Sequence, residues 1–411
     1  MIPWKLLGPQ LAVAAGLLGS LSLGLLVPPD RATDRTPYRA ARILAALALL
    51  AGLTLLSPCR TGGGAMELVR LDGISASWQL IFLLGALPLV LLMEASGGLS
   101  FVLAMGAVLG MGLAASANHL FALFLGLELM SLPTYLLILN LRRDRRGIEA
   151  AVKYFFCGAA ASALYLMGLS IYYAAVGSFT MTPAEQPRAA AALGLVLMGS
   201  AAIFKVGAFP MQFWLPDVYE ASPPELSGFM STTVKAAGFL ILLRLLAMAR
   251  GGIVPGLQWW LPGLSVATMT LGNLLALRQG NLQRLLAYSS IAHVGYLLAG
   301  VWAWGADPSA GPPATVYIYL AAYLFMNTGA FLFLKITGVS ELRHLRGLAG
   351  RHPGPARQAR AASPVRKLRR PSSFLPARPP WPTRWPSPEI SAGQHLHPNR
   401  VIQSRDLSCS P

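Results

Sequence analysis

Five ionisable residues stand in stretches that are otherwise apolar, and their types suit proton transfer. Glu128 lies in LFLGLELMSLPTYLL, Lys205 in GSAAIFKVGAFP and Lys235 in FMSTTVKAAGFLIL. His293 lies in LLAYSSIAHVGYLL, and Lys153 lies near the start of VKYFFCGAAAS. Burial in an apolar medium disfavours the charged form of such side chains, whereas a nearby opposite charge favours it. A glutamate and a lysine whose separation changes would therefore take up and release a proton.

Each of these residues also has a purely structural interpretation. Lys153 is close enough to a predicted helix end for its ammonium group to snorkel to water, and His293 would fit a hydrogen-bonded core. Snorkelling suits Lys205 and Lys235 less well, because each has a long run of apolar or small residues on at least one side. Since a charge at mid-membrane depth costs about 2.5 to 3.5 kcal/mol, we expect Glu128 and both of these lysines to be functional.

The elements that position these residues are predicted to be membrane-spanning helices. Of the 411 residues, 55% are hydrophobic and 12% are charged, which excludes an ordinary soluble globular protein. A spanning helix needs about 20 mostly apolar residues, and backbone groups that face lipid must pair within their own segment. The sequence predicts an all-α polytopic membrane protein with about eleven such helices, near 6–27, 41–57, 76–93, 99–117, 119–140, 153–177, 189–220, 226–249, 259–277, 284–304 and 315–337.

A break is predicted in the seventh stretch, between Lys205 and Pro210. Gly207 and Pro210 follow Lys205 closely, and proline removes a helical donor and kinks or ends a helix. Broken helices inside membranes are tolerated where they line a polar cavity. We therefore expect Lys205 to lie beside a polar path.

The charge distribution predicts the orientation. The net charge is +17, but the last 61 residues hold 11 of the 33 Lys and Arg and only 2 of the 16 Asp and Glu. If every stretch crosses once, one side receives most of the loop arginines, which predicts a multi-pass membrane protein with that side in the cytoplasm and the N-terminus facing outward. Because the excess charge is concentrated in the tail, we expect no nucleic-acid partner. The arginines on that predicted cytoplasmic side are Arg31, Arg35, Arg39, Arg42, Arg142, Arg143, Arg145, Arg146, Arg278, Arg284, Arg343 and Arg346.

The cysteines predict that this chain carries no redox centre and no metal. Cys59, Cys157 and Cys409 are too far apart for the spacing of a cluster site. Cys157 lies in an apolar run, which favours a packing role. His395 and His397, with Cys409, resemble a metal site only superficially.

Four runs of the sequence resemble the antiporter-like membrane subunits of respiratory complex I, and most closely the NADH-quinone oxidoreductase subunit N family. They are LFLGLELMSLPTYLL, GIEAAVKYFFCGAAASALYLMGLSIYYAAVGS, FKVGAFPMQFWLPDVYEASPPELSGFMSTTVKAAGF and NLQRLLAYSSIAHVGYLLAG. Together they cover most of residues 118–350. The sequences DVYE and FMSTTVKAAGF favour this family over its sodium/proton antiporter and hydrogenase relatives, which share the pattern of Glu and Lys residues.

The resemblance implies a role in proton translocation. It assigns the charge pair of a proton half-channel to Glu128 and Lys205, onward transfer to Lys235, and further positions in the polar path to Lys153 and His293. It implies other complex I membrane subunits and the lipid bilayer as partners, with quinone involved only indirectly. NADH, FMN, iron–sulfur clusters and quinone would bind partner subunits, so the enzyme activity is that of an assembled NADH:quinone oxidoreductase.

The resemblance also implies an inverted-repeat bundle whose second repeat is incomplete here. The expected divisions are three helices in 1–98, a five-helix repeat in 99–250, a partial repeat in 251–350 and a disordered tail rich in Pro and Arg in 351–411. Two interpretations stay open for the tail: a shift of reading frame near residue 350, or a basic cytoplasmic segment that binds anionic lipid. Gln212 stands where the family usually has a histidine and cannot titrate.

Three functions remain in competition at this stage. The first is a proton-translocating subunit of NADH-quinone oxidoreductase. The second is a subunit of a cation/proton antiporter or of a membrane-bound hydrogenase complex. The third is a truncated relic without function.

Overall fold

The computed structural model describes an almost entirely helical protein. The described residues are 7–26, 36–56, 64–65, 68–71, 73–94, 98–181, 189–249, 260–306 and 313–346. The chain divides into two units, residues 1–359 and 360–411, and every described residue belongs to the first. The predicted tail, 351–411, lies outside the described residues.

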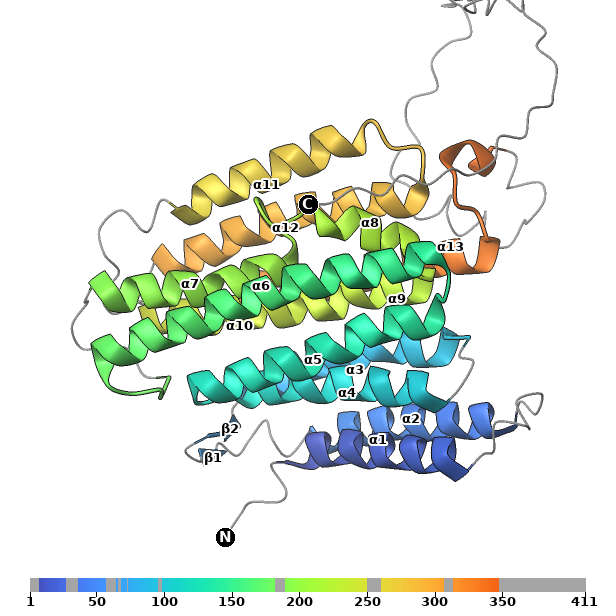
Figure 1. Ribbon diagram of the computed structural model, residues 1–411, viewed down its shortest axis with the longest axis horizontal. Coiled ribbons are helices and arrows are strands. Elements are labelled where there is room, and N and C mark those ends of the chain that lie inside the picture. The colour runs from blue at the N-terminus through green and yellow to red at the C-terminus, as the bar shows by residue number, and fades with distance from the viewer. Residues whose placement is uncertain are drawn as a thin grey trace, which may run out of the picture. The chain divides into compact units, whose positions relative to one another are not determined.

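Within these ranges the chain forms thirteen α-helices and one antiparallel ladder of two short strands (Figure 1). A π-helical turn, Met230–Val234, joins α9 to α10 without interruption, and a 3-10 turn covers Leu342–Leu345. The elements are α1 Gly8–Leu26, α2 Thr36–Leu55, β1 Gly64–Ala65, β2 Arg70–Leu71, α3 Gly73–Leu92, α4 Gly98–Ser116, α5 Leu120–Leu141, α6 Arg145–Val176, α7 Ala189–Val206, α8 Trp214–Ala221, α9 Pro224–Phe229, α10 Lys235–Ala249, α11 Trp260–Ala276, α12 Leu282–Ala306 and α13 Ala314–Thr337.

A helix occupies each of the eleven stretches predicted from the sequence, so the all-α fold is confirmed. Among the described residues, eight helical segments are long and apolar enough to cross a membrane, and α1 adds a shorter apolar run, Gly8–Leu23. Helices α2 and α11 occupy predicted stretches but are not among the eight. The eight are 74–92, 98–116, 120–141, 145–176, 189–206, 224–249, 282–306 and 314–337.

Loops that are distant in sequence contact each other on the same side of the bundle, as expected if each helix crosses the membrane once. The backbone N–H of Leu282 donates to the carbonyl of Ser340 at 2.8 Å, which joins the loop before α12 to the loop after α13. The N–H of Met181 donates to the carbonyl of Asn118 at 3.0 Å, and the N–H of Asn118 donates to the carbonyl of Leu68 at 3.0 Å. The first of these contacts joins loops predicted to be cytoplasmic, and the other two join loops predicted to be periplasmic.

Neighbouring helices pack in pairs, and α10 lies at the centre of the contacts that matter for the site. Helices α4 and α5, α6 and α7, and α11 and α12 run against each other along their lengths (Figure 1). Helix α10 packs on α7, α3 and α4, and most of its side chains are buried. A helix that is apolar on nearly all sides and covered on nearly all sides can hold a polar group away from lipid.

Helix α6 begins two turns earlier than the sequence predicted. Asp144 caps its start: the side chain accepts a hydrogen bond from the N–H of Gly147 at 2.9 Å. This bond, with a smaller contribution from Arg142, holds the pKa of the Asp144 carboxyl below its ordinary value. Because the cap sits at residue 144, Lys153 lies inside the helix and not at its first turn.

The break after Lys205 is confirmed. Helix α7 ends at Val206, Gly207 adopts a φ of 72°, and the Phe209–Pro210 peptide bond is cis. A left-handed backbone is strained for residues with a Cβ, and a Cβ at position 207 would also overlap Leu215. The chain resumes helical structure only at Trp214, which leaves Lys205 next to a non-helical segment that is buried at Gly207 and Ala208 and reaches the surface at Phe209.

Candidate functional site

Lys205 lies in the protein interior among aromatic rings. Its side chain is 1% exposed, and its Nζ donates to the hydroxyl of Tyr135 at 3.2 Å and to that of Tyr154 at 3.5 Å. The Nζ also lies 4.9 Å from the centroid of each tyrosine ring and 5.6 Å from that of Phe204. Hydroxyls and ring faces both stabilise an ammonium group, so this pocket can hold Lys205 without a carboxylate in contact.

Glu128 is connected to Lys205 through α5. Its carboxylate accepts a hydrogen bond from the Ser162 hydroxyl on α6 and forms no ion pair with Lys205. Ser131 and Tyr135 follow Glu128 by three and seven residues, a spacing that places all three on one face of the helix. Tyr135 therefore lies on the same face of α5 as Glu128, and its hydroxyl contacts Lys205.

Lys235 follows the π-helical turn and is as deeply buried as Lys205. Its side chain is 1% exposed, and its Nζ donates to the Ser290 carbonyl at 3.1 Å and to the Ser290 hydroxyl. A π-helical turn is rare and often marks a functional site. Gly238, one turn after Lys235, packs so tightly on α7 that a Cβ there would lie 3.1 Å from the Cβ of Lys205. The two lysines thus come from helices in direct contact.

His293 belongs to a cluster of tyrosines between α12 and α13. Its Nδ1 shares a hydrogen bond of 2.6 Å with the hydroxyl of Tyr319. The rings of Tyr296, Tyr319 and Tyr323 lie 5.7, 6.0 and 5.2 Å from the imidazole ring. His293 is half-buried and one helical turn from Ser290, so it lies close to the partner of Lys235.

Lys153 lies at the rim of the protein and not in its interior. Its side chain is 45% exposed and pairs with Glu149 at 2.8 Å and with Asp217 at 3.2 Å. Asp217 and Glu220 are both 2.8 Å from the guanidinium of Arg284. These residues line an open, charged cavity of about 270 Å³, together with Arg142, Arg146, Ala150 and Ala221. Lys153 can therefore exchange protons with water directly.

The described contacts connect the predicted residues in part. Tyr135 contacts Lys205 and follows Glu128 on α5, whereas Ser290 contacts Lys235 and precedes His293 by one turn on α12. Sequence reasoning missed these two connecting residues. The position of Tyr135, seven residues after Glu128, was a signal that could have identified it, whereas Ser290 required the packing of α10 on α12.

Sequence reasoning also missed a buried ion pair. Glu225, at the start of α9, has a side chain 2% exposed, and its Oε1 lies 3.1 Å from the Nζ of Lys335 near the end of α13. The same Nζ lies 3.0 Å from Glu94, which follows α3 and is 81% exposed. The signal was weak, because each residue stands near a helix end where a charge is ordinary.

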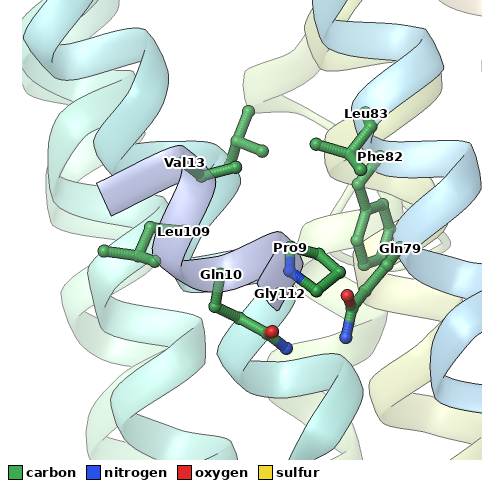
Figure 2. Close-up of a pocket in the computed structure, with 9 residues that line it drawn as sticks. Pro9, Gln10, Val13, Gln79, Phe82, Leu83, Leu109 and Gly112 are labelled. Carbon is green, nitrogen blue, oxygen red and sulfur yellow. The ribbon is translucent and has the colours of Figure 1, made fainter. Parts of the chain in front are cut away.

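A second cavity is too small to be a substrate site. It lies among α1, α3 and α4, and Figure 2 shows Gln10 and Gln79 on its wall with apolar neighbours such as Phe82 and Leu109. Its volume is about 10 Å³, close to the minimum for one water molecule. Among the described residues, no group of three or more His, Cys, Asp and Glu is arranged to hold a metal ion.

The sequence matches the family described as NADH:quinone oxidoreductase/Mrp antiporter over residues 117–355. NADH-quinone oxidoreductase subunit N 1 of Koribacter versatilis is 39% identical over 71% of this chain and 62% of its own length. Subunit N 2 of Rhizobium meliloti is 35% identical over 87% of this chain and 76% of its own length. Subunit N of Salinibacter ruber is 40% identical, and the chain spans only 58% of it.

The fold is similar to that of solved membrane complexes. A chain of respiratory complex I from Thermus thermophilus, solved with bound aureothin, is 34% identical with a TM-score of 0.72, covering 84% of this chain and 75% of that one. A chain of the Mrp complex from a Dietzia species is 20% identical with a TM-score of 0.69, covering 81% of this chain and 65% of that one. The latter similarity shows a shared fold alone. The family resemblance predicted from the motifs is confirmed.

Proposed function

This chain belongs to the NADH-quinone oxidoreductase subunit N family, and from that premise we propose that it moves protons across the bacterial inner membrane as a subunit of a respiratory complex. NADH oxidation and quinone reduction would occur in partner subunits and drive the movement. The FMN, the iron–sulfur clusters and the quinone would be bound there. This chain supplies the ionisable side chains through which protons pass.

One observation carries the proposal: two lysines that are each 1% exposed lie on helices in direct contact, and each donates to hydroxyl groups. A buried lysine that lacks a carboxylate in contact loses its proton more readily than one in an ion pair. Hydroxyl groups both donate and accept hydrogen bonds. Lys205 and Lys235 can therefore alternate between charged and neutral forms without leaving their sites.

In this proposal the proton passes along the chain of contacts in one order. Lys153, beside the charged cavity, exchanges protons with cytoplasmic water. Glu128 and Lys205 form the next pair, connected through Tyr135. Lys235 receives the proton from the region of Lys205, and Ser290 and His293 carry it onward.

The proposed orientation places the charged cavity in the cytoplasm and the N-terminus in the periplasm. It rests on the loop arginines, which favour the cytoplasmic side. Three of them, Arg142, Arg146 and Arg284, line the cavity. Lys153 and the broken segment after Lys205 then face the side from which protons are taken.

The test is proton pumping by the assembled complex in sealed vesicles, with NADH as the electron donor. We expect Glu128→Gln and Lys205→Ala to reduce pumping strongly, because each removes a titrating group from the pair. Arg145→Gln is the matched control, since Arg145 is exposed and only its surface charge is lost. Unchanged pumping in both Glu128→Gln and Lys205→Ala would refute the proposal.

The same vesicles separate this function from that of an antiporter subunit. Proton movement that requires NADH and a quinone supports the proposal. Proton movement that proceeds without either and requires an opposing gradient of sodium would support the antiporter instead. A chain that fails to enter any complex would support the interpretation as a relic.

A further inference from the structure

The buried pair of Glu225 and Lys335 lies outside the path described above and has the features of a proton-loading site. Exposure decreases in steps from Glu94, at 81%, through Lys335, at 22%, to Glu225, at 2%. The Nζ of Lys335 is within 3.1 Å of both carboxylates. A proton taken up by Glu94 from water can therefore pass through Lys335 to the buried carboxylate of Glu225.

Glu225 is only partly satisfied by this contact. Its Oε1 faces Lys335, whereas its Oε2 is buried and has no hydrogen-bond partner among the described residues. A buried carboxylate oxygen without a donor is costly when charged. Protonation at Oε2 relieves this, and the resulting hydroxyl group can donate further into the protein. An ion pair that served stability alone would be expected to satisfy both oxygens.

Helices α9 and α13 run antiparallel, and two contacts fix their register. Glu225 faces Lys335, and a Cβ on Gly228 would lie 3.1 Å from the Cβ of Phe331. Continuing this register puts Thr232 level with Asn327 and Lys235 level with Tyr323. Ten residues separate Glu225 from Lys235, which at 1.5 Å per residue is about 15 Å along the helix.

A stripe of α13 that spans this distance carries polar groups. Tyr319, Tyr323, Asn327, Phe331 and Lys335 recur every four residues, so each lies next to the following one on a stripe that winds around the helix. The Tyr323 hydroxyl lies near Ser290 and Asn327, yet within the described part of the chain neither it nor the Asn327 Nδ2 has a hydrogen-bond partner. Buried polar atoms of this kind are usually satisfied by water.

Phe331 is the one apolar residue of this stripe, and Tyr219 of α8, which carries a hydroxyl group, packs beside it. The two rings pack edge to face at 6.1 Å. The Tyr219 hydroxyl is buried, lies near Ser290 and Tyr323, and finds no hydrogen-bond partner in the ranges that the structure describes. Ser290 in turn accepts from Lys235. Polar groups with free hydrogen-bonding capacity therefore extend from Glu225 toward Lys235.

We propose that Glu225, Lys335 and Glu94 form a second cytoplasmic proton-uptake site, which supplies Lys235 along α13 independently of Glu128 and Lys205. In the loading step an Nζ–H bond of Lys335 breaks and an O–H bond forms on Oε1 of Glu225, and rotation of the carboxyl group then exchanges the two oxygens, so that the hydroxyl takes the buried position of Oε2. The Nζ then regains a proton from Glu94 or from water, so charge and atoms balance. The inference rests on the proposed function of the chain in proton movement.

The test uses the assembled complex in vesicles and measures protons moved per NADH oxidised, a ratio that does not depend on how much complex assembles. We expect Glu225→Gln to lower this ratio, because glutamine keeps the shape but cannot carry a proton. The matched control is Glu341→Gln, which removes an exposed cytoplasmic-side carboxylate that pairs with Arg343 and should leave the ratio unchanged.

A double variant separates proton loading from structural pairing. Glu225→Gln leaves Lys335 with only the exposed Glu94, whereas Glu225→Gln combined with Lys335→Gln leaves no unpaired buried charge. If the pair is structural, the double variant recovers the wild-type ratio. If Glu225 carries protons, the ratio stays as low as in Glu225→Gln.

An infrared difference spectrum between the oxidised and NADH-reduced complex gives an independent readout. We expect a protonated-carboxyl band that is lost in Glu225→Gln and kept in Glu341→Gln. A wild-type ratio in Glu225→Gln, or recovery in the double variant, overturns this inference. If Lys205→Ala still abolishes pumping in that case, the proposed function stands; if Lys205→Ala also pumps normally, the function itself fails.

Discussion

Gly158 on α6 lies directly against the hydroxyl group of Tyr135 on α5. A Cβ at position 158 would overlap the hydroxyl oxygen and lie 2.9 Å from the Cζ of the ring. The same hydroxyl accepts the hydrogen bond from Lys205 at 3.2 Å. The absence of a side chain at Gly158 therefore sets where Tyr135 can meet Lys205.

We expect Gly158→Ala to slow proton pumping, because the tyrosine hydroxyl must move away from Lys205. Overpacking of this kind costs about 1 to 3 kcal/mol, so assembly should weaken less than activity. Pumping in vesicles measures the effect. The double variant with Tyr135→Phe should be little slower than Tyr135→Phe alone, because the oxygen that makes most of the clash is gone and only the contact with Cζ at 2.9 Å has to relax. A double variant much slower than both single ones would contradict this explanation.

Ser290→Ala is expected to slow proton transfer through Lys235. The substitution removes the hydroxyl that Lys235 contacts and leaves only the backbone carbonyl, 3.1 Å away. A hydrogen bond to a charged group contributes about 1.5 to 3 kcal/mol, so a rate slower by roughly 10- to 150-fold is expected if the whole contribution is lost at a single step. The neighbouring Ser289→Ala is the matched control and should behave as the wild type. Equal rates in the two variants would exclude a role for the Ser290 hydroxyl.

Lys153→Gln should slow pumping less than Lys205→Ala does. Lys153 is 45% exposed, beside a cavity of about 270 Å³, so water can take over its role. Exposed ion pairs contribute about 0 to 1 kcal/mol, and the thermal stability should hardly change. Pumping rates of the two variants in the same vesicles provide the comparison. A complete loss of pumping in Lys153→Gln would show that water cannot substitute for this side chain.

Gly207→Ala should destabilise the chain by about 1 to 3 kcal/mol, because alanine would have to adopt a left-handed backbone. The φ at this position is 72°, and the new methyl group would overlap Leu215. Gly199→Ala in the preceding helix, α7, meets no atom within 4 Å and should be neutral or slightly stabilising. Thermal denaturation of the purified chain in detergent measures both. Equal melting temperatures would contradict the strain at Gly207.

Acid should remove the stabilising effect of the Asp144 cap. The pKa of this carboxyl is lowered by the N–H of Gly147 and by Arg142, so the ionised form stabilises the folded state. That stabilisation is complete above the unfolded pKa of about 3.9 and is lost as the pH falls through the folded value.

Asp144→Asn tests this pH dependence, because asparagine can cap the helix but does not titrate. Melting temperatures of wild type and variant, measured between about pH 6 and pH 3, should converge as the pH falls. A constant difference across this range would mean that the charge of Asp144 does not stabilise the start of α6.

The sequence alone located the helices because a membrane span has a strict length and composition. It also located the break after Lys205, since Gly207 and Pro210 act on the backbone locally. It failed to place the start of α6, because the predicted stretch began with the apolar run at Lys153, whereas Asp144 starts the helix through a side-chain hydrogen bond.

The candidate residues Glu128, Lys205 and Lys235 were identifiable because a charge in an apolar run is conspicuous wherever it lies. Their connections were not. Tyr135 meets Lys205 across 70 residues of sequence, and Ser290 meets Lys235 across 55. Glu225 and Lys335, separated by 110 residues, each stand near a helix end where a charge is unremarkable. Composition and spacing determined which side chains enter the membrane region, because burial of a charge is costly in any fold. Only the packing of helices distant in sequence decided which hydroxyls, rings and carboxylates those charges meet, because contacts between helices depend on side-chain shapes that no single segment contains.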